Sequence, residues 1–232
     1  MKIVKKMIAE FLGTFFLVFF ACGIACVVSA SEGNNALFNV VVALGFGLAL
    51  IASIYTIGNV SGSHINPAVS IAMLIDGRMK VGEFFGYICA QFLGAIAGAA
   101  LLAVFVPATP LGTNTFDPAV LSYGKAILIE VVLTCLFVYT VLCTTAKADF
   151  HGAGIVNGFA LTLVHILGIS FTGTSVNPAR TFGPAFIKML QGDNLAISQY
   201  WVFLVAPLVG GVLAALIYKL LNKCCCKCKK EE

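Results

Sequence analysis

An asparagine–proline–alanine triplet occurs twice in the chain, and it is the sequence feature with the clearest chemistry. The first copy, within SHINPAV, is Asn66, Pro67 and Ala68, and the second, within TSVNPAR, is Asn177, Pro178 and Ala179. Asparagine is a strong helix N-cap, and proline is favoured at the first helical position, where its missing N–H costs nothing. Each triplet therefore predicts the start of a helix. Because the capping side chain uses its carbonyl oxygen on the backbone, we expect its NH₂ group to be free to donate into a lumen.

Both of these helices are predicted to be short. The first runs through the apolar residues 68–75 and stops at Asp76-Gly77, and the second runs from Pro178 to about Lys188. Eight to ten helical residues extend about 12–15 Å, which is about half of a bilayer's hydrocarbon core. Each triplet thus predicts a half-helix rather than a full transmembrane span.

The remaining composition indicates a membrane protein. Of the 232 residues 60% are hydrophobic and 10% are charged, whereas soluble domains carry about a quarter charged residues. Six apolar runs reach the roughly 20 residues that a span needs: 8–30, 37–57, 84–105, 126–145, 152–169 and 200–221. The first follows three lysines, as a signal peptide would, but its length favours a retained span. The sequence predicts an all-α membrane protein with six transmembrane helices and two half-helices, in one domain over 1–232.

The two halves of the chain, about 1–110 and 120–221, repeat each other. Each half contains three spans, and its triplet follows the second of them. Because three is odd, the second half must be inverted relative to the first, which places a substrate path between the halves near the midplane. The half-helices then meet there with their N-termini, each carrying about half a positive charge. Opposed half-helix dipoles block cations and protons, so the pattern favours a pore.

The basic residues predict that both termini are cytoplasmic. In that orientation only Lys125, Arg180 and Lys188, of 14 lysines and arginines, lie outside, in agreement with the positive-inside rule. The net charge of +4 then reflects topology and attraction to anionic lipid headgroups. The sequence shows no basic face on a soluble surface, so a nucleic-acid partner is not expected. The default location is the plasma membrane of a cell.

Residues 222–232 are predicted to be a cytoplasmic tail rich in cysteine and lysine. Its cysteines are Cys224, Cys225, Cys226 and Cys228. Three interpretations remain open: an unstructured reduced tail, S-acylation at the membrane surface, or metal binding. Metal binding is the least favoured because no histidine or second cysteine pair lies nearby. No metal and no cofactor is predicted.

With these motifs in place, nearly the whole chain resembles the aquaporin, or major intrinsic protein, family. The resemblance rests on AEFLGTF, SGSHINPAV, GFGLA, GFALT and TSVNPAR, and it is greatest to microbial water-selective members. It implies a homotetramer with one pore in each protomer, through which water crosses passively while ions and protons are excluded.

The resemblance also assigns residues. It implies a narrow selectivity filter on the external side, formed by Phe46, His165, Thr174 and Arg180. Phenylalanine with histidine is typical of the water-selective filter, and glycerol-conducting relatives usually have aspartate where Thr181 follows Arg180. From the residues alone, His165 is open to an interhelix contact and Arg180 to a lipid phosphate, although an ionisable residue at membrane depth is functional by default.

Four further positions follow from the resemblance. Glu10 and Glu130 match paired glutamates that hold the half-helix loops, although Glu10 is also open to being an interfacial charge. His64 matches a position near the inner vestibule, with a bystander role equally open. Ser63 departs from the family pattern, which usually has a glycine there.

Three other functions are weighed against a water channel. Glycerol, ammonia and hydrogen peroxide are alternative substrates for such a pore, and Phe46 with His165 argues against bulky polyols. An ion channel or proton-coupled transporter would need carboxylates or rings of charge along the path, and only Glu10 and Glu130 qualify. An enzyme is not expected, because the sequence contains no nucleophile–base pair, spaced histidine set or nucleotide loop.

Overall fold

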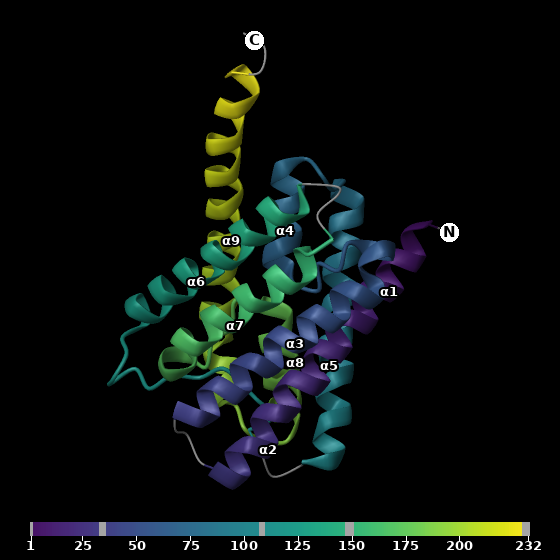
Figure 1. The fold of residues 1–232 in the computed structure, drawn as a ribbon. Coiled ribbons are helices and arrows are strands. Elements are labelled where there is room, and N and C mark those ends of the chain that lie inside the picture. The colour runs from purple at the N-terminus through teal and green to yellow at the C-terminus, as the bar shows by residue number, and fades with distance from the viewer. Residues whose placement is uncertain (1, 33–35, 107–109, 147–150, 229–232) are drawn as a thin grey trace.

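The chain folds into a bundle of helices in the computed structural model, which describes residues 2–32, 36–106, 110–146 and 151–228 (Figure 1). Side chains are described over the same ranges except at residue 2, residues 30–32 and residues 223–228. Within these ranges the helices are α1 (Lys2–Phe16), η1 (Leu17–Cys22), α2 (Gly23–Glu32), α3 (Ala36–Ser61), α4 (Pro67–Asp76), α5 (Val81–Phe105), α6 (Tyr123–Thr145), α7 (Ala153–Thr172), α8 (Pro178–Leu190) and α9 (Leu195–Cys228).

Six helices in the described ranges are long and apolar enough to cross a membrane, as predicted. The first is the continuous rod of α1, η1 and α2, whose central turn is a π-helix, and the others are α3, α5, α6, α7 and α9. Several ends lie outside the apolar runs. The last helix begins at Leu195 rather than at residue 200, because backbone hydrogen bonding continues through polar residues such as Ser198 and Gln199.

The two half-helices begin at the triplets. Asn66 is extended and its Oδ1 accepts from the N–H of Ala68 at 2.8 Å, while Asn177 accepts from the N–H groups of Ala179 and Arg180 at 3.1 and 3.2 Å. In each helix the proline follows at the first position. α4 ends at Gly77, whose φ of 85° is the left-handed conformation that favours glycine. The predicted caps and the first predicted stop are therefore confirmed.

The helix pairing is the same in the two halves. α1 packs against α5 in the first half and α6 against α9 in the second, while α3 and α7 pack against each other across the middle. Each half-helix contacts the third long helix of the opposite half: α4 contacts α9, and α8 contacts α5. Glycines allow this approach, because a Cβ on Gly183 or Gly211 would lie 2.4 Å from the carbonyl oxygen of Ala95 or Ala68.

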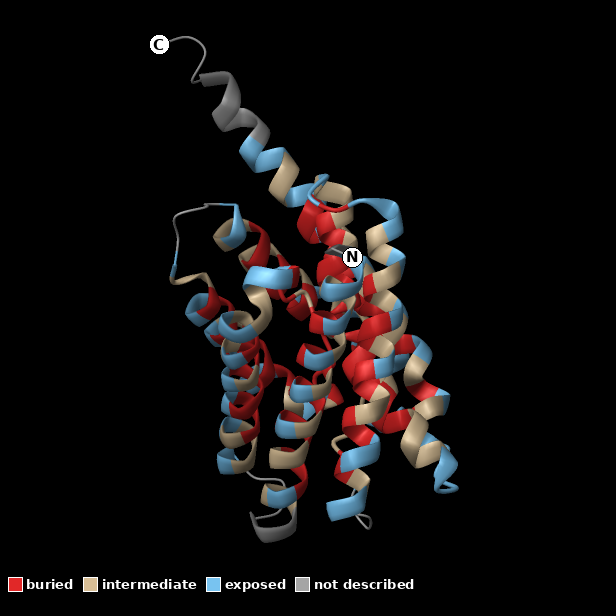
Figure 2. Cartoon of the chain, turned by 90° about the vertical axis from the view of Figure 1, so that its right-hand side faces the viewer, coloured by how far each residue is buried: buried red, intermediate tan, exposed pale blue. Residues whose placement is uncertain are grey.

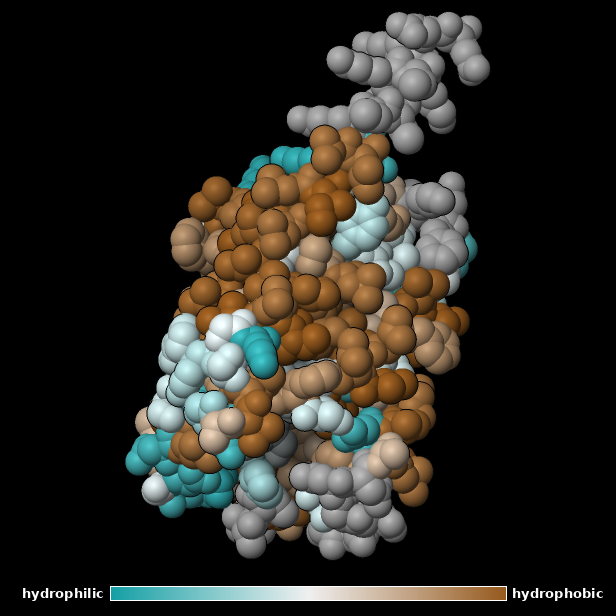
Figure 3. All heavy atoms as spheres, turned by 90° about the vertical axis from the view of Figure 1, so that its left-hand side faces the viewer, coloured by the Kyte–Doolittle hydropathy of each residue, from teal (hydrophilic) through white to brown (hydrophobic). Residues whose placement is uncertain are grey.

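Apolar side chains lie on the outer surface of the helix bundle, as expected for a protein surrounded by lipid. Large hydrophobic side chains such as Phe20, Leu128 and Leu163 are more than half exposed, and apolar residues cover most of the face drawn in Figure 3. Buried residues lie on the inward sides of the helices (Figure 2). The interior includes polar groups that soluble cores rarely bury, among them two glutamates and an arginine. These interior polar groups define the candidate site.

Candidate functional site

The two capping asparagines bind across the interface between the halves. The Nδ2 of Asn66 donates to the carbonyl oxygen of Val176 at 2.8 Å, and the Nδ2 of Asn177 donates to that of Ile65 at 2.9 Å. The prediction that each NH₂ group is wholly free is therefore wrong. One N–H of each group ties its half-helix to the loop of the other half, because that loop brings a carbonyl within reach. One N–H of each amide remains for a molecule in the lumen.

Glu10 lies fully buried at the loop before α4. Its Oε1 accepts from Ser61 Oγ at 2.7 Å and from the N–H of His64 at 2.9 Å. Its Oε2 accepts from the N–H of Ile65 at 2.6 Å and from Gln91 Nε2 at 2.8 Å. A single carboxylate therefore collects four donors and fixes the backbone of this loop.

Glu130 is arranged in the same way at the loop before α8. This carboxylate is also fully buried, and it accepts from Thr172 Oγ1 at 2.6 Å and from the N–H groups of Ser175 and Val176 at 2.8 and 2.9 Å. The equivalence of Thr172 with Ser61 and of Val176 with Ile65 extends the sequence repeat into the hydrogen bonds.

The carboxylates hold backbone that is otherwise unfavourable. Ser63, Ile65, Thr174 and Val176 have φ values of 51°, 42°, 50° and 45°. This left-handed region is costly for non-glycine residues and most unusual for β-branched ones. Ser63 thus adopts the conformation for which glycine is suited, which explains why a glycine is usual at this position in the family that the sequence resembles.

Three of the four predicted filter residues lie together. The rings of Phe46 and His165 are stacked with centroids 4.3 Å apart, and the guanidinium carbon of Arg180 lies 4.6 Å from the centroid of Phe46. Thr174 is buried one loop away, with Oγ1 close to Gly168 of α7, and it is not among the residues lining the cavities described below.

His165 gives this cluster an unpartnered acceptor and Arg180 gives it an unpartnered donor. His165 Nδ1 lies 2.9 Å from the carbonyl oxygen of Leu161, and since a carbonyl only accepts, Nδ1 carries the proton. In the neutral ring Nε2 is then an acceptor. His165 Nε2 and Arg180 Nε are both buried and have no hydrogen-bond partner among the described residues. Both residues line the narrow segment described below, so a small polar molecule there meets an acceptor and a donor.

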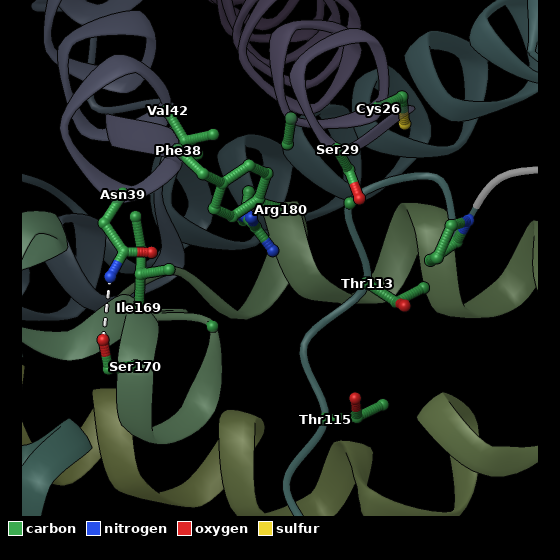
Figure 4. Close-up of a pocket in the computed structure, with 14 residues that line it drawn as sticks. Cys26, Ser29, Phe38, Asn39, Val42, Thr113, Thr115, Ile169, Ser170 and Arg180 are labelled. Carbon is green, nitrogen blue, oxygen red and sulfur yellow. Dashed lines mark hydrogen bonds between the residues drawn. The ribbon is translucent and has the colours of Figure 1, made fainter. Parts of the chain in front are cut away.

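Three cavities follow one another through the protein. The largest of the three, about 470 Å³, is lined by polar and apolar residues of α2, α3, α7 and the 110–122 segment, and by Arg180 (Figure 4). A narrow segment of about 10 Å³ shares Arg180 with it and is lined by Phe46, His165 and both capping asparagines. A cavity of about 40 Å³ shares His64 with the narrow segment. The narrow segment is close to the least space that holds one water molecule.

Comparison with known proteins decides the family. Residues 1–218 match the family model described as major intrinsic protein. The chain belongs to the major intrinsic protein family. It is 42% identical to an Aquaporin Z of Brucella melitensis over 93% of this chain and 96% of the relative. It is also 41% identical to a lens fiber major intrinsic protein of Lithobates pipiens, over 92% of this chain and 80% of the relative.

A solved structure agrees with this assignment. The aquaglyceroporin from Plasmodium falciparum superposes with a TM-score of 0.81 at 27% identity, over 93% of this chain and 95% of the other. The predicted family and the predicted aquaporin-like, six-span fold are therefore confirmed. As a major intrinsic protein, the chain is a multi-pass membrane channel for water or small solutes, and it is not an enzyme.

His64 lies where the narrow segment meets the 40 Å³ cavity, and it lines both. Its Nδ1 lies 3.1 Å from Ser70 Oγ, and its ring packs edge-on against Tyr87 with centroids 5.1 Å apart. The ring is therefore held in place by a neighbour from α4 and another from α5. Its role in conduction stays a prediction.

Two residues of the site were missed by sequence reasoning. Gln91 donates to both Glu10 and Ser70. A glutamine within the apolar run 84–105 could have been recognised from the sequence as a buried hydrogen-bonding residue. Asn114 accepts from the side chains of Arg180 and Thr181. Asn114 gave no signal from its sequence, because it lies among prolines, glycines and other loop-forming residues between the two halves, and only the fold brings it to Arg180.

The cysteine tail is not tested by the structure. The helix α9 extends to Cys228, but the side chains of Cys224, Cys225, Cys226 and Cys228 lie outside the described residues. Over the ranges that the structure does describe, no three histidine, cysteine, aspartate or glutamate side chains gather as metal ligands. The acylation and metal-binding interpretations remain predictions.

Proposed function

We propose that this channel conducts water passively and excludes protons and ions. The observation that carries the proposal is the narrow segment of about 10 Å³, which contains one unpartnered acceptor on His165 and one unpartnered donor on Arg180. A single water molecule donates to His165 Nε2 and accepts from Arg180 Nε, so it replaces part of its lost hydration there. The positive charge of Arg180 disfavours cations at the same point.

The centre of the pore supplies the barrier to protons. Asn66 and Asn177 each retain one N–H that is not used in the bond across the halves. The N-termini of α4 and α8 add about half a positive charge each. A water molecule between them accepts from both sides and turns its own hydrogens outward, which interrupts a continuous proton wire. Opposed half-helices exclude cations by the same field.

A second candidate substrate class is other small neutral solutes: glycerol, ammonia or hydrogen peroxide. The observation in favour of it is the similarity to a solved aquaglyceroporin. The stacked pair of Phe46 and His165 argues against glycerol, because it leaves little space beside Arg180. Threonine rather than aspartate after Arg180, and the Aquaporin Z relatives, also favour water.

We further propose a homotetramer in the plasma membrane with both termini in the cytoplasm. Six spans put the two termini on one side, and both lie toward the same end in Figure 1. Lys5, Lys6, Arg78 and Lys80 are on the side assigned as cytoplasmic.

Osmotic shrinkage of proteoliposomes, followed by stopped-flow light scattering in sucrose and then in glycerol, tests the function. We expect shrinkage much faster than in empty liposomes and no fast glycerol re-entry. Arg180→Val removes the donor and the charge, so glycerol entry should rise about tenfold, as expected for the loss of one charged hydrogen-bonding group. Folded protein that shrinks no faster than empty liposomes would refute the water channel, and fast glycerol entry in the wild type would favour the second class.

A further inference from the structure

The guanidinium of Arg180 is held by a residue of the 110–122 segment. Asn114 is fully buried, and its Oδ1 accepts a hydrogen bond from Arg180 Nη1 and another from Thr181 Oγ1, the latter at 2.7 Å. Its Nδ2 lies 3.4 Å from the carbonyl oxygen of Thr172, the last residue of α7. One amide therefore joins the first turn of α8, the end of α7 and the loop between the two halves.

The surroundings of the guanidinium leave it room to move. Arg180 lines both the 470 Å³ cavity and the narrow segment, so it has open space on one side and the Phe46 ring, 4.6 Å away, on the other. Its Nε has no partner among the described residues. Both lone pairs of the Asn114 oxygen are used by donors of α8, and the bond to Arg180 is charge-assisted, which makes it one of the stronger kinds.

We propose that Asn114 is a positioning residue for selectivity: it fixes the Arg180 guanidinium against Phe46 and so sets the width of the narrow segment. The proposal rests on the proposed function, since it assigns the filter to Phe46, His165 and Arg180. Without the Asn114 oxygen, the guanidinium is free to swing into the large cavity, where there is room for it and for water. The narrow segment then loses one wall, and larger solutes pass.

Gln199 of α9 provides a matched control. It is also a buried amide that holds the same loop, because its Oε1 accepts from the N–H of Phe116 at 3.0 Å and its Nε2 donates to the carbonyl oxygen of Phe116 at 2.8 Å. It touches the loop two residues after Asn114 and is not a lining residue of the cavities. A variant of Gln199 therefore loosens the loop without removing the acceptor of Arg180.

The test compares the ratio of water to glycerol permeability in reconstituted Asn114→Leu, Asn114→Asp and Gln199→Leu proteins. Asn114→Leu should lower the ratio about five- to tenfold, the effect expected for one lost hydrogen bond. Asn114→Asp keeps the acceptor and should stay within about twofold of the wild type, as should Gln199→Leu. An unchanged ratio in Asn114→Leu, or an equal fall in Gln199→Leu, would overturn the proposal. If Asn114→Leu does not fold, Asn114→Ser, which is too short to reach both donors, replaces it.

A double variant separates positioning from a general structural role. If Asn114 acts through Arg180, Asn114→Leu should leave the ratio unchanged in an Arg180→Val background, and a further fall there would contradict the proposal. If the wild type conducts no water, the proposed function fails. A crystal structure of Asn114→Leu then still tests whether Asn114 positions the Arg180 guanidinium. A guanidinium displaced from Phe46 supports the positioning role, and one in its original place refutes it.

Discussion

The loops before the two half-helices have the same scaffold and different chemistry. In each, a buried glutamate accepts from a hydroxyl and from two consecutive backbone N–H groups, and an asparagine caps the helix and binds across to the other loop. The two copies differ at the third residue after the asparagine, which is Val69 in the first copy and Arg180 in the second. The scaffold was thus duplicated, while the charge was placed on one side only.

The supporting residues differ in a corresponding way. The first loop has Gln91 of α5 bonded to Glu10 and Ser70, which adds a fourth donor to that carboxylate. The second loop has Asn114 bonded to Arg180 and Thr181. The amide of Gln91 thus supports the buried glutamate, whereas the amide of Asn114 binds the charged residue, Arg180. The comparison therefore separates the residues that hold both loops from those to which we assign the selectivity.

The largest expected effect comes from removing either carboxylate. Glu10→Ala and Glu130→Ala each leave at least three buried donors without an acceptor, and each such group costs about 1–3 kcal/mol. Because the left-handed backbone also loses its support, we expect both variants to lose most of their folded yield in detergent, measured by size-exclusion chromatography. A near-wild-type yield for one of them would show that the two loops are not energetically equivalent.

A smaller effect is expected from a charge at the centre. Asn66→Asp and Asn177→Asp keep a capping oxygen but replace the NH₂ donor with a negative charge, which attracts cations. Both should raise proton or potassium leak in proteoliposomes, measured with a pH-sensitive dye or by ion flux. Arg180 lines the same narrow segment and lies one helical turn from Asn177, so it should offset the charge more at that position. We expect the leak of Asn66→Asp to be larger by about threefold, and the reverse order would contradict this account.

Sequence reasoning reached the parts of the molecule that follow from local chemistry or from the repeat. The caps at Asn66 and Asn177, the glycine stop at Gly77 and the six spans each follow from residue type and apolar length. The second bond of each asparagine, across to the other loop, did not follow, since it depends on a carbonyl 110 or more residues away. Asn114 was missed for the same reason. Helix ends such as Leu195 were misplaced because apolar length measures the hydrocarbon core, whereas a helix continues wherever its hydrogen bonds are satisfied.

The smallest expected effect compares the equivalent residues Ser63 and Thr174. Both have positive φ and a hydroxyl without a partner among the described residues, so glycine relieves backbone strain in each. Ser63→Gly loses little packing, and the relief is partly offset by the greater freedom of the unfolded chain, so we expect a gain in unfolding free energy below about 1 kcal/mol.

Thr174 differs because its side chain fills the space beside Gly168, where a Cβ would lie 2.4 Å from Thr174 Oγ1. Thr174→Gly leaves a void there, which should outweigh the relief and destabilise the protein by about 1 kcal/mol. Unfolding of both variants in mixed micelles measures the difference. Equal shifts would mean that strain alone governs these loops, whereas opposite signs would show that packing of the Thr174 side chain outweighs the strain in the second copy.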